Sequence, residues 1–166
     1  TYIGYEVFAY CSKLKSVTFG KLSRLETIGD SAFYRCRALT SMTIPSLVNY
    51  IGGSAFTDCT GLTSIAIPDS VKTIEYEGLY GFTGLKSVTF GQLSLLETIE
   101  SAAFAYCILL TSMTIPSKVT LIGDNAFKGS GLTSVIIQEG VESIGYDAFN
   151  GCSKLTYVSI PPSVTY

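Results

Sequence analysis

Apolar and small polar positions recur along the chain in seven units of 22 to 25 residues. Each unit begins at an isoleucine that is followed five residues later by an aromatic or other apolar residue. These isoleucines are Ile3, Ile28, Ile51, Ile74, Ile99, Ile122 and Ile144. Since a unit of this length cannot bury its own apolar face, neighbouring units must stack to form a shared core. The pattern therefore predicts a solenoid.

The second half of each unit alternates apolar and small polar residues, as in LTSMTIP at 39–45. Such alternation predicts a half-buried strand with successive side chains on opposite faces. Proline has no N–H to donate to a sheet, so it ends the strand. It follows four of these stretches, at Pro45, Pro68, Pro116 and Pro161. The sequence thus predicts one strand in each unit.

The first half of each unit places apolar residues at i, i+4, i+5 and i+8, as in Ile28, Ala32, Phe33 and Cys36. This spacing is one stripe of a short helix. Polar residues stand where N-caps are expected. They are Asp30 or Ser31, Ser54, Asn125 and Asp147. We therefore expect about two helical turns after each isoleucine.

The combined motif, a strand L-x-x-V-x-I-P followed by V-x-x-I-G-x-x-A-F-x-x-C, resembles the BspA-like, Treponema-type leucine-rich repeat from Ile3 to about Val164. The fourth unit departs from it, with Leu79 for phenylalanine and Phe82 for cysteine. The resemblance implies an α/β solenoid, a right-handed superhelix of about seven repeats with a concave parallel β-sheet and short convex helices. It also implies a cell-surface or secreted adhesion region and supplies no catalytic residues.

Two units carry a longer turn before the next isoleucine. Residues 14–33 return as residues 85–104 with fifteen of twenty positions unchanged, so a block of three repeats is duplicated. The extensions GKLSRLETI and GQLSLLETI add an apolar residue, Leu22 or Leu93, that the shorter units lack. The sequence leaves open whether this turn shapes the curvature of the solenoid or presents a contact edge.

The composition narrows the functional classes. The 166 residues carry a formal net charge of −2, a poor electrostatic match for nucleic acid. There is no histidine, which removes the commonest general base and metal ligand and argues against an enzyme. No run of 18 apolar residues predicts a membrane span. We expect a single domain over 1–166 that needs no cofactor.

Cysteine and aspartate recur at repeat positions, which invites a metal or redox interpretation. All five cysteines occupy one position, so a column of small buried thiols is the simpler prediction. Asp30, Asp124 and Asp147 recur near the expected helix starts, where capping explains them better than a metal site does.

The outward positions of the predicted strands form the candidate binding surface. Alternation turns Ser16 and Thr18 outward, and equivalent positions extend over a sheet about 29 Å wide at a strand spacing of ~4.8 Å. The candidate partner-binding residues are Ser41, Thr43, Ser112, Thr114, Ser134, Ile136, Tyr157 and Ser159. They are either polar filler on a solvated sheet or a contact surface anchored by Ile136 and Tyr157, which break the small polar pattern.

The functional prediction is a non-enzymatic protein–protein interaction or adhesion module. By the resemblance, its partners are host extracellular-matrix or cell-surface proteins. The alternative is a spacer or stalk without a ligand of its own. Ice binding by the hydroxyl rows is a third reading, which the interruptions at Ala66, Ile136 and Tyr157 disfavour. Because neither end carries an atypical capping unit, we also expect a segment of a longer protein, or an excised piece of one, with end-to-end self-association.

Overall fold

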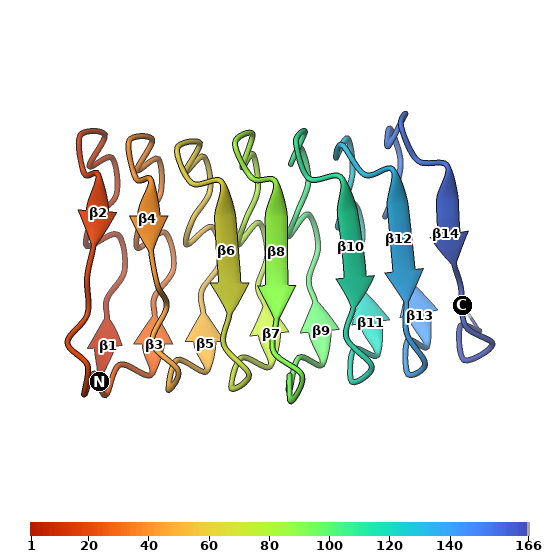
Figure 1. Ribbon diagram of the computed structural model, residues 1–166, viewed down its shortest axis with the longest axis horizontal. Coiled ribbons are helices and arrows are strands. Elements are labelled where there is room, and N and C mark those ends of the chain that lie inside the picture. Colours follow the sequence, from red (N-terminus) through yellow and green to blue (C-terminus); the bar gives the residue numbers. More distant parts are fainter. Residues whose placement is uncertain (166) are drawn as a thin grey trace.

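Each unit folds into one coil, and the seven coils stack side by side along one axis (Figure 1). This computed structural model describes residues 1–165. Every coil contributes two strands, and all strand pairs are parallel. The strands follow one another in the order β1 (Tyr2–Ile3), β2 (Ser16–Val17), β3 (Thr27–Ile28), β4 (Ser41–Met42), β5 (Tyr50–Ile51), β6 (Ser64–Ile67), β7 (Thr73–Ile74), β8 (Ser87–Phe90), β9 (Thr98–Ile99), β10 (Ser112–Ile115), β11 (Leu121–Ile122), β12 (Ser134–Ile137), β13 (Ser143–Ile144) and β14 (Tyr157–Ser159). The predicted solenoid of repeats is confirmed.

The odd-numbered strands form a seven-stranded sheet that the sequence pattern did not predict. The seven isoleucines lie in this sheet, where Ile28 pairs with Ile3 on one side and Ile51 on the other. The side chain of each interior isoleucine, from Ile28 to Ile122, is buried. Their inward position was predicted, but they belong to strands and do not begin helices.

The even-numbered strands are those that the alternation predicted. They pair in three groups, β2 with β4, β6 with β8, and β10 with β12 and β14. The hydrogen-bonded sheet is therefore interrupted among the described residues, and the expected continuous sheet of seven strands is wrong in this respect. In β6 the residues alternate between exposed and buried, with Ile65 and Ile67 facing the core.

Residues 1–165 contain no helix, so the predicted helical turns are wrong. Two residues of each coil, three and seven positions after the isoleucine, have φ between 54° and 74°. They are Glu6, Tyr10, Ser31, Arg35, Ser54, Asp58, Glu77, Gly81, Ala102, Tyr106, Asn125, Gly129, Asp147 and Gly151. A left-handed residue at these two places ends any right-handed helix after a single turn.

Hydrogen bonds between coils take the place of the helical ones. The N–H of Phe33 donates to the carbonyl of Ala55 in the next coil at 2.8 Å, whereas that of Tyr34 donates to Ser31 in its own coil at 3.0 Å. This alternation satisfies the backbone polar groups, as burial requires. The coils are thereby joined along the side opposite the even-numbered strands. The residues predicted as N-caps, such as Ser54 and Asn125, lie in turns.

A column of stacked phenylalanine rings fills the centre of the coils. Phe33 lies between Phe8 and Phe56, with ring centroids 5.2 and 5.4 Å away. In the fourth coil Leu79 replaces the ring, and Phe82 is buried at the position where other coils have cysteine. Phe82 is larger than the cysteine it replaces, and Leu79 is smaller than the phenylalanine it replaces. The two changes offset each other in volume, which explains the departure of this unit from the repeat pattern.

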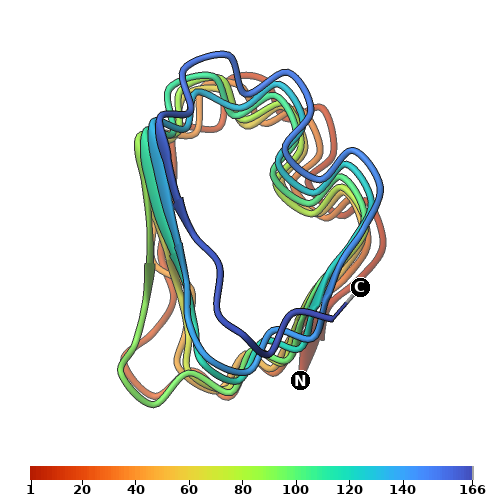
Figure 2. The ribbon, with the colours of Figure 1, turned by 90° about the vertical axis from the view of Figure 1, so that its right-hand side faces the viewer.

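The two longer turns protrude from the stack. In the view along the axis, the red and green coils extend beyond the others at the lower left (Figure 2). These are the segments at 20–25 and 91–96. Because both lie at the same corner of the coil, the duplication of three repeats places two equivalent turns on one edge.

Candidate functional site

The outward side chains of the even-numbered strands form a surface that we call the hydroxyl face. Alternation in β10 places Ser112 and Thr114 outward while Met113 and Ile115 are buried. This confirms the predicted directions of the side chains. Six of the candidate residues are exposed and two are half-buried. Ser41, Thr43, Ser112, Thr114, Ile136 and Tyr157 are exposed, and Ser134 and Ser159 are half-buried.

The structure gathers six of the eight candidates in one ladder. Across β10, β12 and β14, Ser112, Ser134 and Tyr157 form one row, and Thr114, Ile136 and Ser159 form the next. Ser41 and Thr43 belong to the second coil, and the strands β6 and β8 separate them from that ladder. The candidate surface is therefore one cluster of six residues with a distant pair.

Ile136 and Tyr157, the anchor pair, lie on adjacent strands within this cluster. Tyr157 pairs directly with Ser134, so Ile136, two residues further along β12, is the diagonal neighbour of Tyr157. At a parallel strand spacing of ~4.8 Å and a rise of ~3.3 Å per residue, residues so placed are about 8 Å apart at Cα, within reach of an aromatic side chain. Their side chains are 47% and 57% exposed. The pair thus presents apolar and aromatic surface beside hydroxyl groups without a deep pocket.

The hydroxyl groups of the face are expected to contribute little to folding. Replacing both Thr43 and Thr114 by alanine should change the free energy of unfolding by less than about 0.5 kcal/mol per site, because both side chains are exposed. Urea denaturation followed by circular dichroism measures this. Loss of the fold would contradict the outward orientation of these residues.

Four cysteines form a buried column, and the first lies outside it. Cys36, Cys59, Cys107 and Cys152 are buried free thiols, whereas Cys11 is exposed. Burial raises the pKa of the Cys36 thiol to about 11, and its S–H donates to the carbonyl of Phe8 in the preceding coil at 3.0 Å. Cys11, in the first of the described coils, is exposed, so the predicted burial is wrong for this residue.

Thiol labelling distinguishes the exposed cysteine from the column. At pH 8 in the folded protein, iodoacetamide should modify Cys11 quickly and the four buried cysteines slowly, because the attacking species is an accessible thiolate. Intact-mass measurement over time should show one fast adduct, and five after denaturation in urea. Rapid addition of several adducts to the folded protein would contradict the buried column.

The recurring aspartates join coils through their carboxylates. Asp30 Oδ1 accepts a hydrogen bond from the Gly53 N–H at 2.9 Å, and Asp124 Oδ1 accepts one from the Tyr146 N–H at 2.7 Å. These aspartates accept hydrogen bonds from N–H groups of the following coil. The prediction that they cap helices is therefore wrong. Within residues 1–165, no three histidine, cysteine or acidic residues are grouped so as to hold a metal ion.

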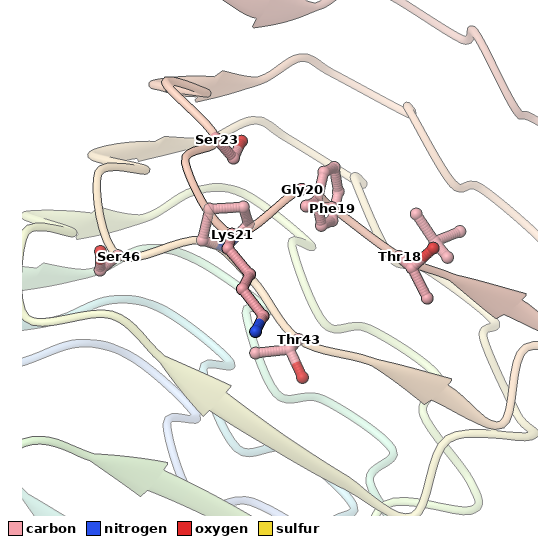
Figure 3. Close-up of a pocket in the computed structure, with 9 residues that line it drawn as sticks. Thr18, Phe19, Gly20, Lys21, Ser23, Thr43 and Ser46 are labelled. Carbon is pink, nitrogen blue, oxygen red and sulfur yellow. The ribbon is translucent and has the colours of Figure 1, made fainter.

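Two hollows beside the longer turns were not predicted from the sequence, but candidate residues of the hydroxyl face line them, Thr43 in the first and Ser112 and Thr114 in the second. The first has a volume of about 300 Å³ and lies between the turn after Phe19 and the end of the neighbouring strand at Thr43 and Pro45. The second, about 440 Å³, has Phe90, Thr114 and Pro116 at the same places. In Figure 3 the Lys21 side chain extends from the first turn toward Thr43. The repetition of residues 14–33 at 85–104, with its longer turn, was the feature of the sequence that pointed to both places.

No helix among the described residues has the length and apolar character needed to cross a membrane.

Comparisons with known proteins agree on one family. The model of the BspA type leucine rich repeat region matches residues 1–95 and 93–166, with six copies. No curated protein sequence matches the chain.

Three solved bacterial structures share the fold. A leucine rich repeat protein of T. pallidum has a TM-score of 0.84 and 28% identity over 95% of this chain and 72% of its own. A leucine-rich repeat protein of Bacteroides ovatus has a TM-score of 0.71 and 28% identity over 96% of this chain and 52% of its own. A leucine rich cell surface protein of Faecalibacterium prausnitzii has a TM-score of 0.61 and 30% identity over 86% of this chain and 45% of its own. The chain thus spans about half the length of the latter two.

Proposed function

Since this chain belongs to the BspA-type leucine-rich repeat family, we propose that it is a non-enzymatic module that binds a protein partner through the hydroxyl face. Three parallel strands, β10, β12 and β14, hold the six clustered candidate residues on a common ladder. A surface of this kind suits a macromolecule better than a small metabolite, which is usually held in a concave pocket.

The anchor pair carries this proposal. Exposed aromatic and large apolar residues that a rigid sheet holds in place lose little conformational freedom on binding and dominate the energetics of many interfaces. Ile136 and Tyr157 stand where the equivalent positions of other strands hold small residues such as Thr114 and Ser112. The hydroxyl groups around them supply adaptable hydrogen-bonding partners.

A cell-surface or secreted location and adhesion to host extracellular-matrix or cell-surface proteins complete the proposal. The support for them is the family resemblance and the description of the F. prausnitzii relative as a leucine rich cell surface protein. These partners belong to the proposal alone, because the chain spans less than half the length of that relative.

A binding screen tests the function of the hydroxyl face. The protein is presented to a panel of purified extracellular-matrix and cell-surface proteins, and binding is measured by biolayer interferometry. The double variant Ile136→Ser, Tyr157→Ser is expected to bind at least ~10-fold more weakly, since truncation of an interface anchor commonly costs 2 kcal/mol or more.

A matched control separates the anchor pair from general surface apolarity. Ile108 and Tyr146 are the same residue types, are also exposed and lie outside the strands of the hydroxyl face. The variant Ile108→Ser, Tyr146→Ser should retain binding. Equal binding by the protein and both double variants would contradict the proposed surface, and the absence of any binder in the panel would favour a spacer or stalk.

A further inference from the structure

We propose that the two longer turns form a duplicated binding site for an extended peptide segment of a partner protein, with two apolar side chains of that segment four residues apart. The site lies at the edge of the solenoid beside the hydroxyl face. Its second copy shares Ser112 and Thr114 with that face, but neither copy includes the anchor pair. Substitutions of the turn leucines and of the anchor pair therefore test the two proposals separately.

The two hollows are one site present twice. Phe19 and Phe90, Thr43 and Thr114, and Pro45 and Pro116 occupy equivalent places in them. Each hollow combines an aromatic ring, a proline and hydroxyl groups, a lining suited to an apolar side chain whose backbone needs hydrogen-bonding partners. We call them the first and second turn sites.

The same internal hydrogen bonds hold both turns. In the first, the Ser23 N–H donates to the Gly20 carbonyl at 2.9 Å and the Ser23 Oγ accepts from the Leu25 N–H at 3.3 Å. In the second, the Ser94 N–H donates to the Gly91 carbonyl at 3.2 Å and the Ser94 Oγ accepts from the Leu96 N–H at 3.3 Å. A turn already ordered in the free protein loses little conformational entropy on binding.

Each turn carries a leucine at its tip that faces solvent. Leu22 is 93% exposed and Leu93 is 78% exposed. The equivalent shorter turns of the other coils lack this residue. The leucines do not line the hollows themselves, but the residues on either side of each one do, Lys21 and Ser23 in the first and Gln92 and Ser94 in the second. Two large apolar side chains at the rims of equivalent hollows point to a partner that contacts both turns at once.

The spacing of the sites selects an extended chain. The turns belong to the first and fourth coils, so they are three coil spacings apart, or about 14 Å at a parallel strand spacing of ~4.8 Å. Residues i and i+4 of an extended segment lie on the same face about 13 Å apart. In a helix, residues on one face are about 10 Å apart at i+7 and about 16 Å apart at i+11, both poorer matches.

Charge distinguishes the two ends of the segment. The first turn carries Lys21 and Arg24, both exposed, where the second has Gln92 and Leu95. The Leu95 N–H of the second turn donates a hydrogen bond to the Asp69 carbonyl at 2.9 Å, which places this acidic residue beside the second turn. An acidic residue beside the apolar side chain in the first site is therefore favoured, and the second site favours an uncharged neighbour.

Peptide selection tests the site. A phage library of random linear 12-residue peptides is selected on the protein, and the enriched peptides are synthesised and measured by fluorescence anisotropy. We expect sequences with two apolar residues four positions apart and Asp or Glu beside one of them. Leu22→Ser and Leu93→Ser should each weaken binding at least ~10-fold, since contact with either turn then fails.

Further variants assign the result to the turn sites. Thr43→Trp with Thr114→Trp fills both hollows from exposed positions and should abolish binding, whereas Lys21→Gln with Arg24→Leu should remove the preference for acidic residues. Ile136→Ser with Tyr157→Ser changes no residue that lines either hollow, although Ile136 pairs with Thr114, and should bind the selected peptides as the parent does. Circular dichroism verifies the fold of each variant.

Three outcomes would overturn the proposal. They are no enrichment over a selection on the Leu22→Ser, Leu93→Ser variant, enriched peptides with helical spacing, and glycan-array binding that depends on the two leucines without any peptide enrichment. Loss of matrix-protein binding in the anchor-pair variant concerns the hydroxyl face and leaves this result unchanged.

Discussion

Replacing Phe33 by alanine is expected to lower the free energy of unfolding by about 3 to 5 kcal/mol, the range measured for emptying a buried aromatic site. Phe33 has no exposed surface, and its ring stacks on Phe8 at 5.2 Å and on Phe56 at 5.4 Å. Removal of the ring leaves a cavity between three coils, and the hydrogen bonds that join the coils restrict its collapse.

Urea denaturation of the parent and variant measures this loss. Because repeat proteins can unfold in parts, fluorescence and circular dichroism must give coincident transitions before a single free energy is assigned. Tyr146→Ala is the matched control, since Tyr146 is an exposed aromatic residue, and it should change stability by less than about 0.5 kcal/mol. A similarly small effect of Phe33→Ala would contradict the stacked column.

The second large effect is expected at Gly131, in the coil that is one residue shorter than the common length. A Cβ at this position would lie 2.7 Å from the Ile108 carbonyl carbon and closer still to its oxygen. Gly131→Ala therefore forces the backbones of two coils apart, and we expect a loss of about 3 kcal/mol, at the upper end of the usual range for overpacking.

Gly20 provides the control for this substitution. A Cβ at Gly20 would meet no atom within 4 Å, so Gly20→Ala should leave the thermal midpoint nearly unchanged. The thermal midpoints of both variants, measured by circular dichroism, compare Gly131, where two backbones approach closely, with Gly20, where there is open space. Equal midpoints for the two variants would show that the short coil has room beside Gly131.

The missed turns illustrate what residue spacing leaves undecided. Apolar residues at i, i+4, i+5 and i+8 describe one face of a helix, but the same positions point inward when turns alternate with left-handed residues. Gly81, Gly129 and Gly151 occupy one of these left-handed positions, and glycine adopts this conformation readily. Tyr10 and Tyr106 share it in other coils, so residue type alone was an incomplete signal.

Left-handed non-glycine residues need compensation from elsewhere in the structure. The left-handed conformation costs an ordinary residue roughly 1–2 kcal/mol relative to the right-handed one. The N–H of Arg35 donates to the carbonyl of Thr57 at 2.8 Å, and every second residue in this region makes an equivalent bond to the next coil. These bonds exist when coils stack, which is why a local pattern predicted helices and the assembled solenoid has none.

The sequence predicted which side chains of the candidate surface face outward, but not which of them lie together. Alternation in the strands was sufficient to turn Ile136 and Tyr157 outward, because successive side chains of a strand take opposite faces. Their diagonal placement depends on the register of β12 against β14, and the hollows depend on how far the longer turns project past their neighbours.

The sequence by itself determined the number of coils, the inward and outward residues of the even-numbered strands, and the phenylalanine and cysteine columns, because each follows from periodic burial. The tertiary structure decided the second sheet, the left-handed turns, the grouping of the strand ladders and the two turn sites. All of these depend on hydrogen bonds and contacts between coils more than 20 residues apart in the chain, which spacing within one coil does not encode.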